Sequence, residues 1–463
     1  MRLSAATSER LPASVAKPGY DWRAQRRGIV HLGVGAFHRA HQASYTDAAM
    51  AAGDRDWTIT GVSLRSPQVR DAIGPQDGLF TLTERDEAGD RTRLIGALRE
   101  VLVAPEYSQS VVHALADPGT HIVTLTVTEK GYCRLPDGTL DRAKAAAPES
   151  LYALLAAAFR SRMAAGIGGL TLVSCDNLAA NGNVLASLMH AYLDRHAPAV
   201  LGWFERECAC PVTMVDRIVP AMSADQLNSV AARLGMRDEG AVITEPFSQW
   251  VIADRFAGSR PRWEAAGAQF VSDVGPYEDA KLRMLNGAHS ALAYLGLAAG
   301  HVYVHEAIAD RAIRPLIERL MREEAAASLD PAPGQDLSLY ADRLLRRFAN
   351  TALPHRLAQI GTDGSQKIGQ RWLTPLAINE RRGHSCPATL QALAAWIVHM
   401  RGDVNPVDDP LRDEIAMLWK SAGCEGIVEA LFGPGGLFAA TWTASAPAAT
   451  ILRGHVKGAT QQG

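Results

Sequence analysis

The chain has 463 residues, of which 47% are hydrophobic and 21% are charged, and its formal net charge is -2. A chain of this length is expected to divide into two or three domains, because single cores stop growing at about 250–300 residues. The near-neutral charge argues against nucleic acid or an anionic membrane surface as the main partner, so we expect a small-molecule ligand.

The six cysteines show no framework spacing, and the Cys208-x-Cys210 pair has no second Cys or His pair nearby to complete a zinc site. The N-terminus lacks the apolar core of a signal peptide. No stretch approaches the roughly 20 apolar residues that a spanning helix needs. These features predict a reducing, cytoplasmic location, no bound metal and no membrane association.

Apolar, β-prone runs alternate with helical patterns through the first part of the chain, which predicts a doubly wound α/β domain. The runs are residues 28–35, 57–64, 121–129, 169–177 and 211–219. Two further β-prone pieces, DGLFTLTERD and RTRLIGALREVLV, lie between the second and third runs, where they could form a hairpin inserted in the sheet. The helical segments HRAHQASYTDAAMAAG and ESLYALLAAAFRSRMAAG each finish on a glycine suited to a C-terminal cap.

Strand signals stop after about Pro276, and helical patterns dominate from Tyr277 onward. We therefore predict a dinucleotide-binding Rossmann-like domain over residues 1–276 and a mostly α-helical substrate and catalytic domain over residues 277–463. Residues 330–336 and 401–410 are expected to be loops.

The first strand is followed directly by Gly33-Val34-Gly35-Ala36-Phe37-His38. The two glycines allow a tight turn through which backbone amides can approach a pyrophosphate at the start of a helix. His38 stands where the GxGxxG motif has its third glycine, so the match is incomplete. The prediction of nucleotide binding therefore rests on the position of the two glycines between a strand and a helix. His38 and His41 stand one turn apart with no third metal ligand, so we expect them to serve packing or anion contact.

The second strand ends in Leu64-Arg65-Ser66. An acidic residue at this place usually binds the ribose of NAD, whereas an arginine can receive the extra phosphate of NADP. This loop is therefore compatible with both NAD and NADP.

The segment KLRMLNGAH (281–289) clusters polar groups in an apolar helix. On a regular α-helix, Glu278, Lys281, Asn286 and His289 fall within an arc of about 140°. Buried ionisable groups are paired or functional, so the segment is either an interior ion-pair network or a catalytic site.

Three chemistries can remove the proton of an alcohol during hydride transfer. The first uses a catalytic zinc ion, but the chain has no cluster of His, Cys and Glu residues spaced as zinc ligands normally are. A YxxxK pair exists at Tyr277 and Lys281, but it comes too late for a compact single-domain reductase. The third solution uses a lysine whose pKa is lowered by burial and neighbouring dipoles or cations, and Lys281 is the candidate.

Six motifs make the chain resemble the polyol-specific long-chain dehydrogenase/reductase family, also called the mannitol dehydrogenase family, over nearly its whole length. They are GVGAFHRAHQ, TLTVTEKGY, SCDNLAANG, VDRIVP, EPFSQWVI and KLRMLNGAHS. The family pattern itself lacks the third glycine.

The resemblance implies that Lys281 is the general base of a KxxxxNxxH signature. It implies that Asn286 and Asn177 hold the reacting oxygen, that His289 binds a substrate hydroxyl, and that Glu278 gates proton exchange with solvent. It also implies that Asp216 lines the substrate site and that no metal is needed. The cofactor contacts we predict are Gly33, Gly35, Ala36, Phe37, Arg65, Thr128 and Glu129.

Residues 355–371, HRLAQIGTDGSQKIGQR, look like the sugar-acid branch of the family, with Arg356 and Lys367 as cations for a carboxylate. A solvated basic loop is the alternative interpretation. We predict NAD-dependent interconversion of D-mannonate and D-fructuronate by a monomer or dimer. A mannitol 2-dehydrogenase, a D-arabinitol 4-dehydrogenase and a non-catalytic nucleotide sensor are the rival hypotheses.

Overall fold

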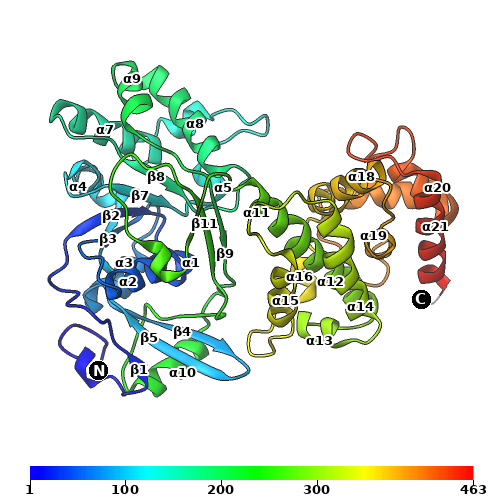
Figure 1. Cartoon of the computed structure of the whole chain (residues 1–463), viewed down its shortest axis with the longest axis horizontal. Helices are drawn as coiled ribbons and strands as arrows, with labels where there is room; N and C mark the ends of the chain where they lie inside the picture. Colours follow the sequence, from blue (N-terminus) through cyan, green and yellow to red (C-terminus); the bar gives the residue numbers. More distant parts are fainter. Residues whose placement is uncertain (462–463) are drawn as a thin grey trace. The chain divides into compact units, whose positions relative to one another are not determined.

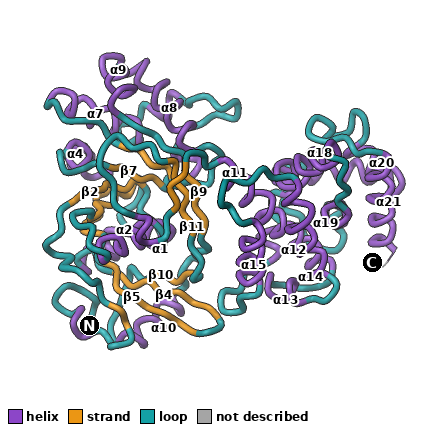
Figure 2. Tube along the Cα trace, viewed as in Figure 1, coloured by secondary structure: helices purple, strands orange, loops and turns teal. Residues whose placement is uncertain are grey.

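The computed structural model describes residues 1–461, which form two compact units, the first comprising Met1–Val274 and the second beginning at Gly275. Strands occur in the first unit, and the described part of the second consists of helices and loops (Figures 1 and 2). The predicted fold class, a Rossmann-type domain followed by a mostly α-helical domain, is confirmed.

The main sheet of the first unit has five parallel strands. In spatial order they are β6 (Leu98–Val103), β3 (Thr58–Ser63), β2 (Arg27–Leu32), β7 (Ile122–Leu125) and β8 (Thr171–Ser174). The chain leaves β2 toward β3 on one side and later adds β7 on the other. The carboxyl end of β2 is therefore a topological switch point, where ligands of such sheets bind.

Helices cover both faces of this sheet, as its buried, unbroken apolar strands require. Val30 and Leu32 of β2 share one core with α4 (Ala104–Ala116), α7 (Leu151–Ala164) and α8 (Asn181–His196). His31 points to the opposite face, where its ring stacks on His38 of α1 (Ala36–Ala40) at 3.6 Å. His41 stacks on Phe37 with ring centres 5.1 Å apart, so both histidines of the HRAHQ motif are used in packing.

Two predicted strand segments belong to small separate sheets, so their placement in the main sheet was wrong. The hairpin of β4 (Phe80–Asp86) and β5 (Gly89–Ile95) lies in a sheet ordered β1-β5-β4-β10, with β1 (Val15–Ala16) and β10 (Val242–Thr244) at its edges. β9 (Thr213–Asp216) pairs with β11 (Gln249–Ala253), which pairs with β12 (Gln269–Val271). The last part of the predicted piece RTRLIGALREVLV does not belong to the hairpin. It forms β6, which is an edge strand of the main sheet.

The predicted glycine caps of the first unit are confirmed. Gly53 follows α2 (Gln42–Ala51) with φ of +101°, and Gly166 follows α7 with φ of +67°. Its other helices are α3 (Gln68–Ile73), α5 (Thr128–Gly131), α6 (Arg142–Ala145), α9 (Pro198–Glu207) and α10 (Ala224–Leu234), with short turns η1 (Ser8–Arg10), η2 (Gly74–Gln76) and η3 (Trp263–Ala266).

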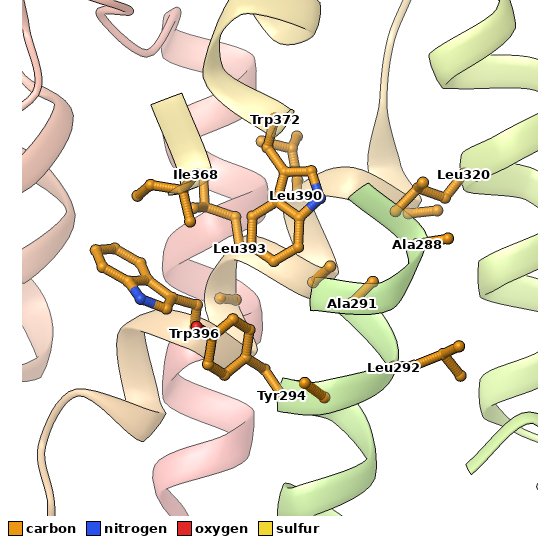
Figure 3. Packing of buried hydrophobic residues seen from close by; sticks show 14 of the residues in the cluster. Ala288, Ala291, Leu292, Tyr294, Leu320, Ile368, Trp372, Leu390, Leu393 and Trp396 are labelled. Atoms are coloured by element: carbon orange, nitrogen blue, oxygen red, sulfur yellow. The ribbon is translucent and has the colours of Figure 1, made fainter. Parts of the chain in front are cut away.

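The second unit is built around α12 (Gly287–Ala298), which is apolar on all sides and packs against α13 (Val304–Ala309), α14 (Ile313–Arg319), α16 (Leu357–Ile360) and α19 (Pro387–His399). Figure 3 shows Tyr294, Trp372 and Trp396 packed in one cluster with Leu390 and Leu393 of α19. The remaining helical elements are α11 (Gly275–Ala280), η4 (Lys281–Asn286), η5 (Leu320–Ala325), α15 (Leu337–Phe348), α17 (Gly364–Ile368), η6 (Gly369–Leu373), α18 (Thr374–Arg381), α20 (Arg412–Phe432) and α21 (Ala446–Gln461). Among the residues described, no helix is long and apolar enough to cross a membrane.

Candidate functional site

The glycine turn after β2 is fixed by its neighbours in the sheet. The backbone N–H groups of Gly33 and Val34 donate to the carbonyl of Val62 at 2.8 and 3.3 Å. Gly33 has a φ of +93°, and a Cβ there would lie 2.3 Å from the carbonyl oxygen of Thr126. A Cβ at Gly35 would have only the carbonyl oxygen of Gly33 within 4 Å, at 3.8 Å. The space beside the Gly35 backbone is therefore open. The turn therefore allows a ligand to approach Gly35 closely.

Gly33→Ala is expected to lower the free energy of unfolding by about 2 kcal/mol or more, because a strained φ and a backbone clash add together. Gly53→Ala is the matched control, since Gly53 also has a positive φ but would meet nothing within 4 Å. Urea unfolding of both variants should separate the cost of the positive φ, which both variants share, from the cost of the clash, which only Gly33→Ala has. Equal losses in the two variants would contradict the clash with Thr126.

A pocket of about 430 Å³ lies over the carboxyl ends of β2, β3 and β7. Three predicted cofactor contacts, Gly33, Arg65 and Thr128, line it, whereas Gly35, Ala36, Phe37 and Glu129 lie outside its lining. The other lining residues are Val34, Ser63, Leu64, Ser66, Val69, Thr126, Val127, Lys130, Gly131, Cys133, Lys144, Ala147, Glu149, Ser150 and Leu151. Apolar walls beside hydroxyls and cations suit a base, a ribose and phosphates, so the residues present fit a dinucleotide.

Asp176 holds the loop on one side of this pocket. Its carboxylate accepts hydrogen bonds from the N–H groups of Val127 at 3.1 Å and Thr128 at 2.8 Å, and from the hydroxyl of Tyr132 at 2.9 Å. Thr128 has a φ of +63°, which is costly for a β-branched residue, and these bonds offset the cost. In the sequence, Asp176 is distinguished only as part of the SCDN motif, and nothing in that motif indicates that its carboxylate holds the neighbouring loop.

Asn177 and Asp216 both lie just beyond or at the carboxyl ends of strands in the first unit. Asn177 lies in the loop between β8 and α8. The buried Asn181 fixes that loop, because its side-chain amide donates to the carbonyls of Asp176 at 3.1 Å and Thr213 at 3.0 Å. Asp216 is the buried last residue of β9, opposite Gln249 of β11.

The segment around Lys281 is not the regular α-helix that we predicted, and this expectation was wrong. Residues 281–286 form the π-helical turn η4 between α11 and α12, and the N–H of Gly287 donates to the carbonyl of Leu282, five residues earlier. Residues five apart lie above one another in a π-turn, so Lys281 and Asn286 share a face more closely than in an α-helix. Such turns occur frequently at functional sites.

The four predicted residues of this helix are all partly buried, while the residues between them are largely buried. The ring of His289 lies 4.9 Å from that of Phe348 and 5.5 Å, edge-on, from that of His355. Burial lowers the pKa of His355, which keeps this imidazole neutral near pH 7. His289 is thus held by two rings from α15 and the loop that follows it.

Arg371 and Trp372 of η6 hold the π-turn from the side. The Nη1 atom of Arg371 donates to the hydroxyl of Ser290 at 2.6 Å and to the backbone carbonyl of Asn286 at 3.4 Å. The indole N–H of Trp372 donates to the carbonyl of Gly287 at 3.1 Å. Burial lowers the pKa of Arg371 to about 10, so the guanidinium stays charged at neutral pH.

The two cations predicted to bind a carboxylate have different surroundings. Arg356 is exposed, and its guanidinium lies 5.5 Å from the centre of the Tyr303 ring. Lys367 is partly buried, and its ammonium donates to the carbonyl of Thr362. Burial, followed by repulsion from Arg371, lowers the pKa of Lys367, while Asp363 and Asp409 oppose that shift. Lys367 and Arg371 therefore lie near each other.

In the part of the chain that the structure describes, no group of three or more His, Cys, Asp or Glu residues could hold a metal ion. The six cysteines are all free thiols.

A parallel sheet of this order with a pocket at its switch point is typical of dinucleotide-binding domains. Residues 27–265 match the mannitol dehydrogenase Rossmann domain, and residues 273–431 match the mannitol dehydrogenase C-terminal domain. The chain therefore belongs to the mannitol dehydrogenase family, and it is an oxidoreductase acting on hydroxyl groups of polyols or sugar acids.

Relatives with both kinds of substrate are similarly close. D-mannonate oxidoreductase of Escherichia coli K12 is 39% identical over 445 residues, which cover 92% of this chain and 91% of the relative. A mannitol 2-dehydrogenase of Phaeosphaeria nodorum is 38% identical over 423 residues, covering 87% and 74%. The solved structure of Pseudomonas fluorescens mannitol 2-dehydrogenase, a ternary complex with NAD and D-mannitol, matches with a TM-score of 0.80, 33% identity and coverage of 100% and 96%.

Proposed function

We propose that the protein interconverts D-mannonate and D-fructuronate with NAD, using Lys281 as the general base and no metal. A bound NAD would supply the acceptor for the hydride of the carbinol carbon. The Lys281 amine takes the hydroxyl proton, and the carboxamide of Asn286 donates a hydrogen bond to the oxygen as it becomes a carbonyl. The π-turn supports this assignment, because residues five apart, such as Lys281 and Asn286, share one face of such a turn.

The remaining roles follow the family resemblance. Asn177, in the loop after β8, is proposed as a second amide donor to the reacting oxygen, and Asp216 as a substrate contact. His289, held by its ring contacts, is proposed to bind a substrate hydroxyl. Glu278, one turn before Lys281 on α11, is proposed to pass the proton to solvent. Gly33, Arg65 and Thr128 would hold the cofactor in the pocket of the first unit.

The choice of a sugar acid rests on Lys367. Among the residues the structure describes, Lys367 has no carboxylate within ion-pair distance, and burial and repulsion from Arg371 both destabilise its charged form. Lys367 uses one of its three ammonium donors on Thr362. A substrate carboxylate would neutralise this charge and accept the remaining donors. Arg356 is proposed as a second, outer cation for the same group.

The alternative is a polyol dehydrogenase acting on mannitol or arabinitol. The similar identities to D-mannonate oxidoreductase and to mannitol 2-dehydrogenase favour this as the second candidate. A panel assay of reduced nicotinamide absorbance with mannonate, altronate, mannitol and arabinitol decides between them. Turnover of polyols alone would overturn the sugar-acid assignment.

Lys367→Met is expected to lower kcat/KM for mannonate by about 10- to 100-fold, because a charged hydrogen bond is lost, and to leave polyol turnover within about twofold. Arg356→Met is expected to cost less, since Arg356 is exposed. The matched control is Lys420→Met, an exposed lysine on α20 of the same unit. Steady-state kinetics with both substrate classes provide the test, and equal losses on mannonate and polyol would argue against a carboxylate contact.

A further inference from the structure

The side chain of His31 lies between two threonine hydroxyls on one face of the main sheet. His31 of β2 stands opposite Thr124 of β7, and Thr126 follows two residues later, on the same face. The Nδ1 atom of His31 lies 2.7 Å from the hydroxyl oxygen of Thr124, and its Nε2 atom lies 2.9 Å from the hydroxyl oxygen of Thr126. Both ring nitrogens are therefore engaged.

The tautomer of His31 is assigned from these contacts. Burial lowers the pKa of His31 to about 3, so the ring is neutral and carries one N–H. The Thr126 hydroxyl donates its proton to the carbonyl of Gly33 at 2.8 Å, so it accepts from Nε2 of His31. Nδ1 then accepts from the hydroxyl of Thr124. A directed chain of hydrogen bonds thus runs from Thr124 through His31 and Thr126 to the Gly33 carbonyl.

This chain ends on a peptide group of the glycine turn that is also held from its other side. The N–H of Val34 belongs to the same peptide group as the Gly33 carbonyl, and it donates to the carbonyl of Val62 at 3.3 Å. Hydrogen bonds at both ends oppose rotation of this peptide group. The Thr126 hydroxyl therefore helps to set the direction of the backbone that leads into Gly35.

The ring of His31 also supports the helix that follows the turn. It stacks on the ring of His38 at 3.6 Å with an angle of 13° between the planes, and His38 belongs to α1, which begins directly after Gly35. His31 is fully buried and lies outside the lining of the pocket, whereas Thr126 lines it. The path from His31 to a bound dinucleotide thus leads through the turn.

We propose that His31 and Thr126 are positioning residues of the cofactor site, which fix the Gly33 carbonyl and thereby keep the turn in the conformation that receives a pyrophosphate. Without the Thr126 hydroxyl, the Gly33 carbonyl loses its partner and the turn is free to adopt other orientations. A site that is formed only part of the time binds its ligand more weakly by that fraction. This inference rests on the nicotinamide cofactor of the proposed function and is independent of its substrate.

Thr126→Val is expected to raise the Kd of NAD by about 10-fold or more in calorimetric titration of the whole chain, whereas Thr126→Ser, which keeps the hydroxyl, should stay within about threefold of the wild type. Thr124→Val is the matched control, because it removes a hydroxyl from the other nitrogen of the same ring and leaves the Gly33 carbonyl held. Its Kd should stay within about twofold of the wild type, even where urea unfolding shows equal losses of stability in the two valine variants. Equal losses of NAD affinity in both would mean that they act through the fold as a whole, and the proposal would be wrong.

His31→Phe distinguishes positioning from direct contact. Phenylalanine keeps a ring to stack on His38 but has no N–H for Thr126, so the Kd of NAD should rise about threefold or more. Adding Thr126→Val should then cost less than it does in the wild type, because both substitutions interrupt one chain of hydrogen bonds. An unchanged Kd in His31→Phe would show that the Thr126 hydroxyl contacts NAD itself, which would overturn the proposal.

Hydrogen–deuterium exchange tests the turn without any ligand. The amide of Val34 should exchange about 10-fold faster in Thr126→Val than in the wild type, and at the wild-type rate in Thr124→Val. Unchanged exchange in Thr126→Val would contradict the positioning role. If the wild-type protein did not bind NAD, the cofactor of the proposed function would be wrong, while this measurement would still decide whether His31 and Thr126 hold the turn.

Discussion

Lys281→Met is expected to lower kcat by about a thousandfold, because a positioned general base contributes roughly 10²- to 10⁴-fold to proton transfer. Methionine keeps an apolar stem of similar length among the buried neighbours of η4, so packing is largely retained. The measurement is steady-state turnover of whichever substrate of the panel the wild-type protein uses.

Cofactor binding should be unchanged in this variant, because the pocket for the cofactor is lined entirely by residues 33–151 of the first unit. Titration with NAD and urea unfolding check this and show whether the fold is intact. Lys420→Met should behave as the wild type in all three measurements. Turnover of Lys281→Met within about tenfold of the wild type would show that another group takes the proton.

The main sheet could be predicted from sequence because its strands are short apolar runs bounded by turn residues. The runs at residues 57–64, 121–129 and 169–177 contain β3, β7 and β8, and the run at residues 28–35 covers all of β2 except its first residue. Burial on both faces of the sheet produces such runs. The run at residues 211–219 contains β9 but pairs elsewhere. The identity of a strand is local, whereas the choice of sheet depends on partners distant in the chain.

The π-turn could not be predicted, because the apolar spacing of KLRMLNGAH fits a regular helix equally well. The groups that hold the turn come from residues 85 positions later, Arg371 and Trp372. The QKIGQR segment resembles the sugar-acid branch of the family, but nothing in its pattern indicates that Arg371 lies against Asn286. Such a contact is tertiary, and it decides the local geometry of the helix.

Arg371→Met is expected to lower kcat by about 10- to 100-fold, with a smaller change in KM. The guanidinium donates a hydrogen bond to the hydroxyl of Ser290 at 2.6 Å and a longer one to the carbonyl of Asn286 at 3.4 Å, and bonds from a charged donor together contribute about 1.5–3 kcal/mol. Without this donor the turn is free to return to α-helical bonding, which is the commoner geometry. Lys281 and Asn286 would then lie farther apart around the helix, and base and amide would no longer address one oxygen.

Arg371→Lys should recover part of the lost turnover, since it restores a cationic donor without the planar fork. Guanidinium ion added at millimolar concentration should also raise kcat of Arg371→Met, whereas a merely destabilised protein would gain nothing from it. Arg453→Met is the control, because Arg453 pairs with Glu429 at the surface of the same unit.

The comparison of substrates separates this positioning role from carboxylate binding. Arg371→Met should slow mannonate and any accepted polyol equally, because both depend on Asn286, whereas Lys367→Met should slow only the sugar acid. A loss confined to the sugar acid in Arg371→Met would mean that the guanidinium binds the substrate carboxylate. The two variants therefore test two separate roles. Arg371→Met tests the positioning of the π-turn, and Lys367→Met tests the binding of the substrate carboxylate.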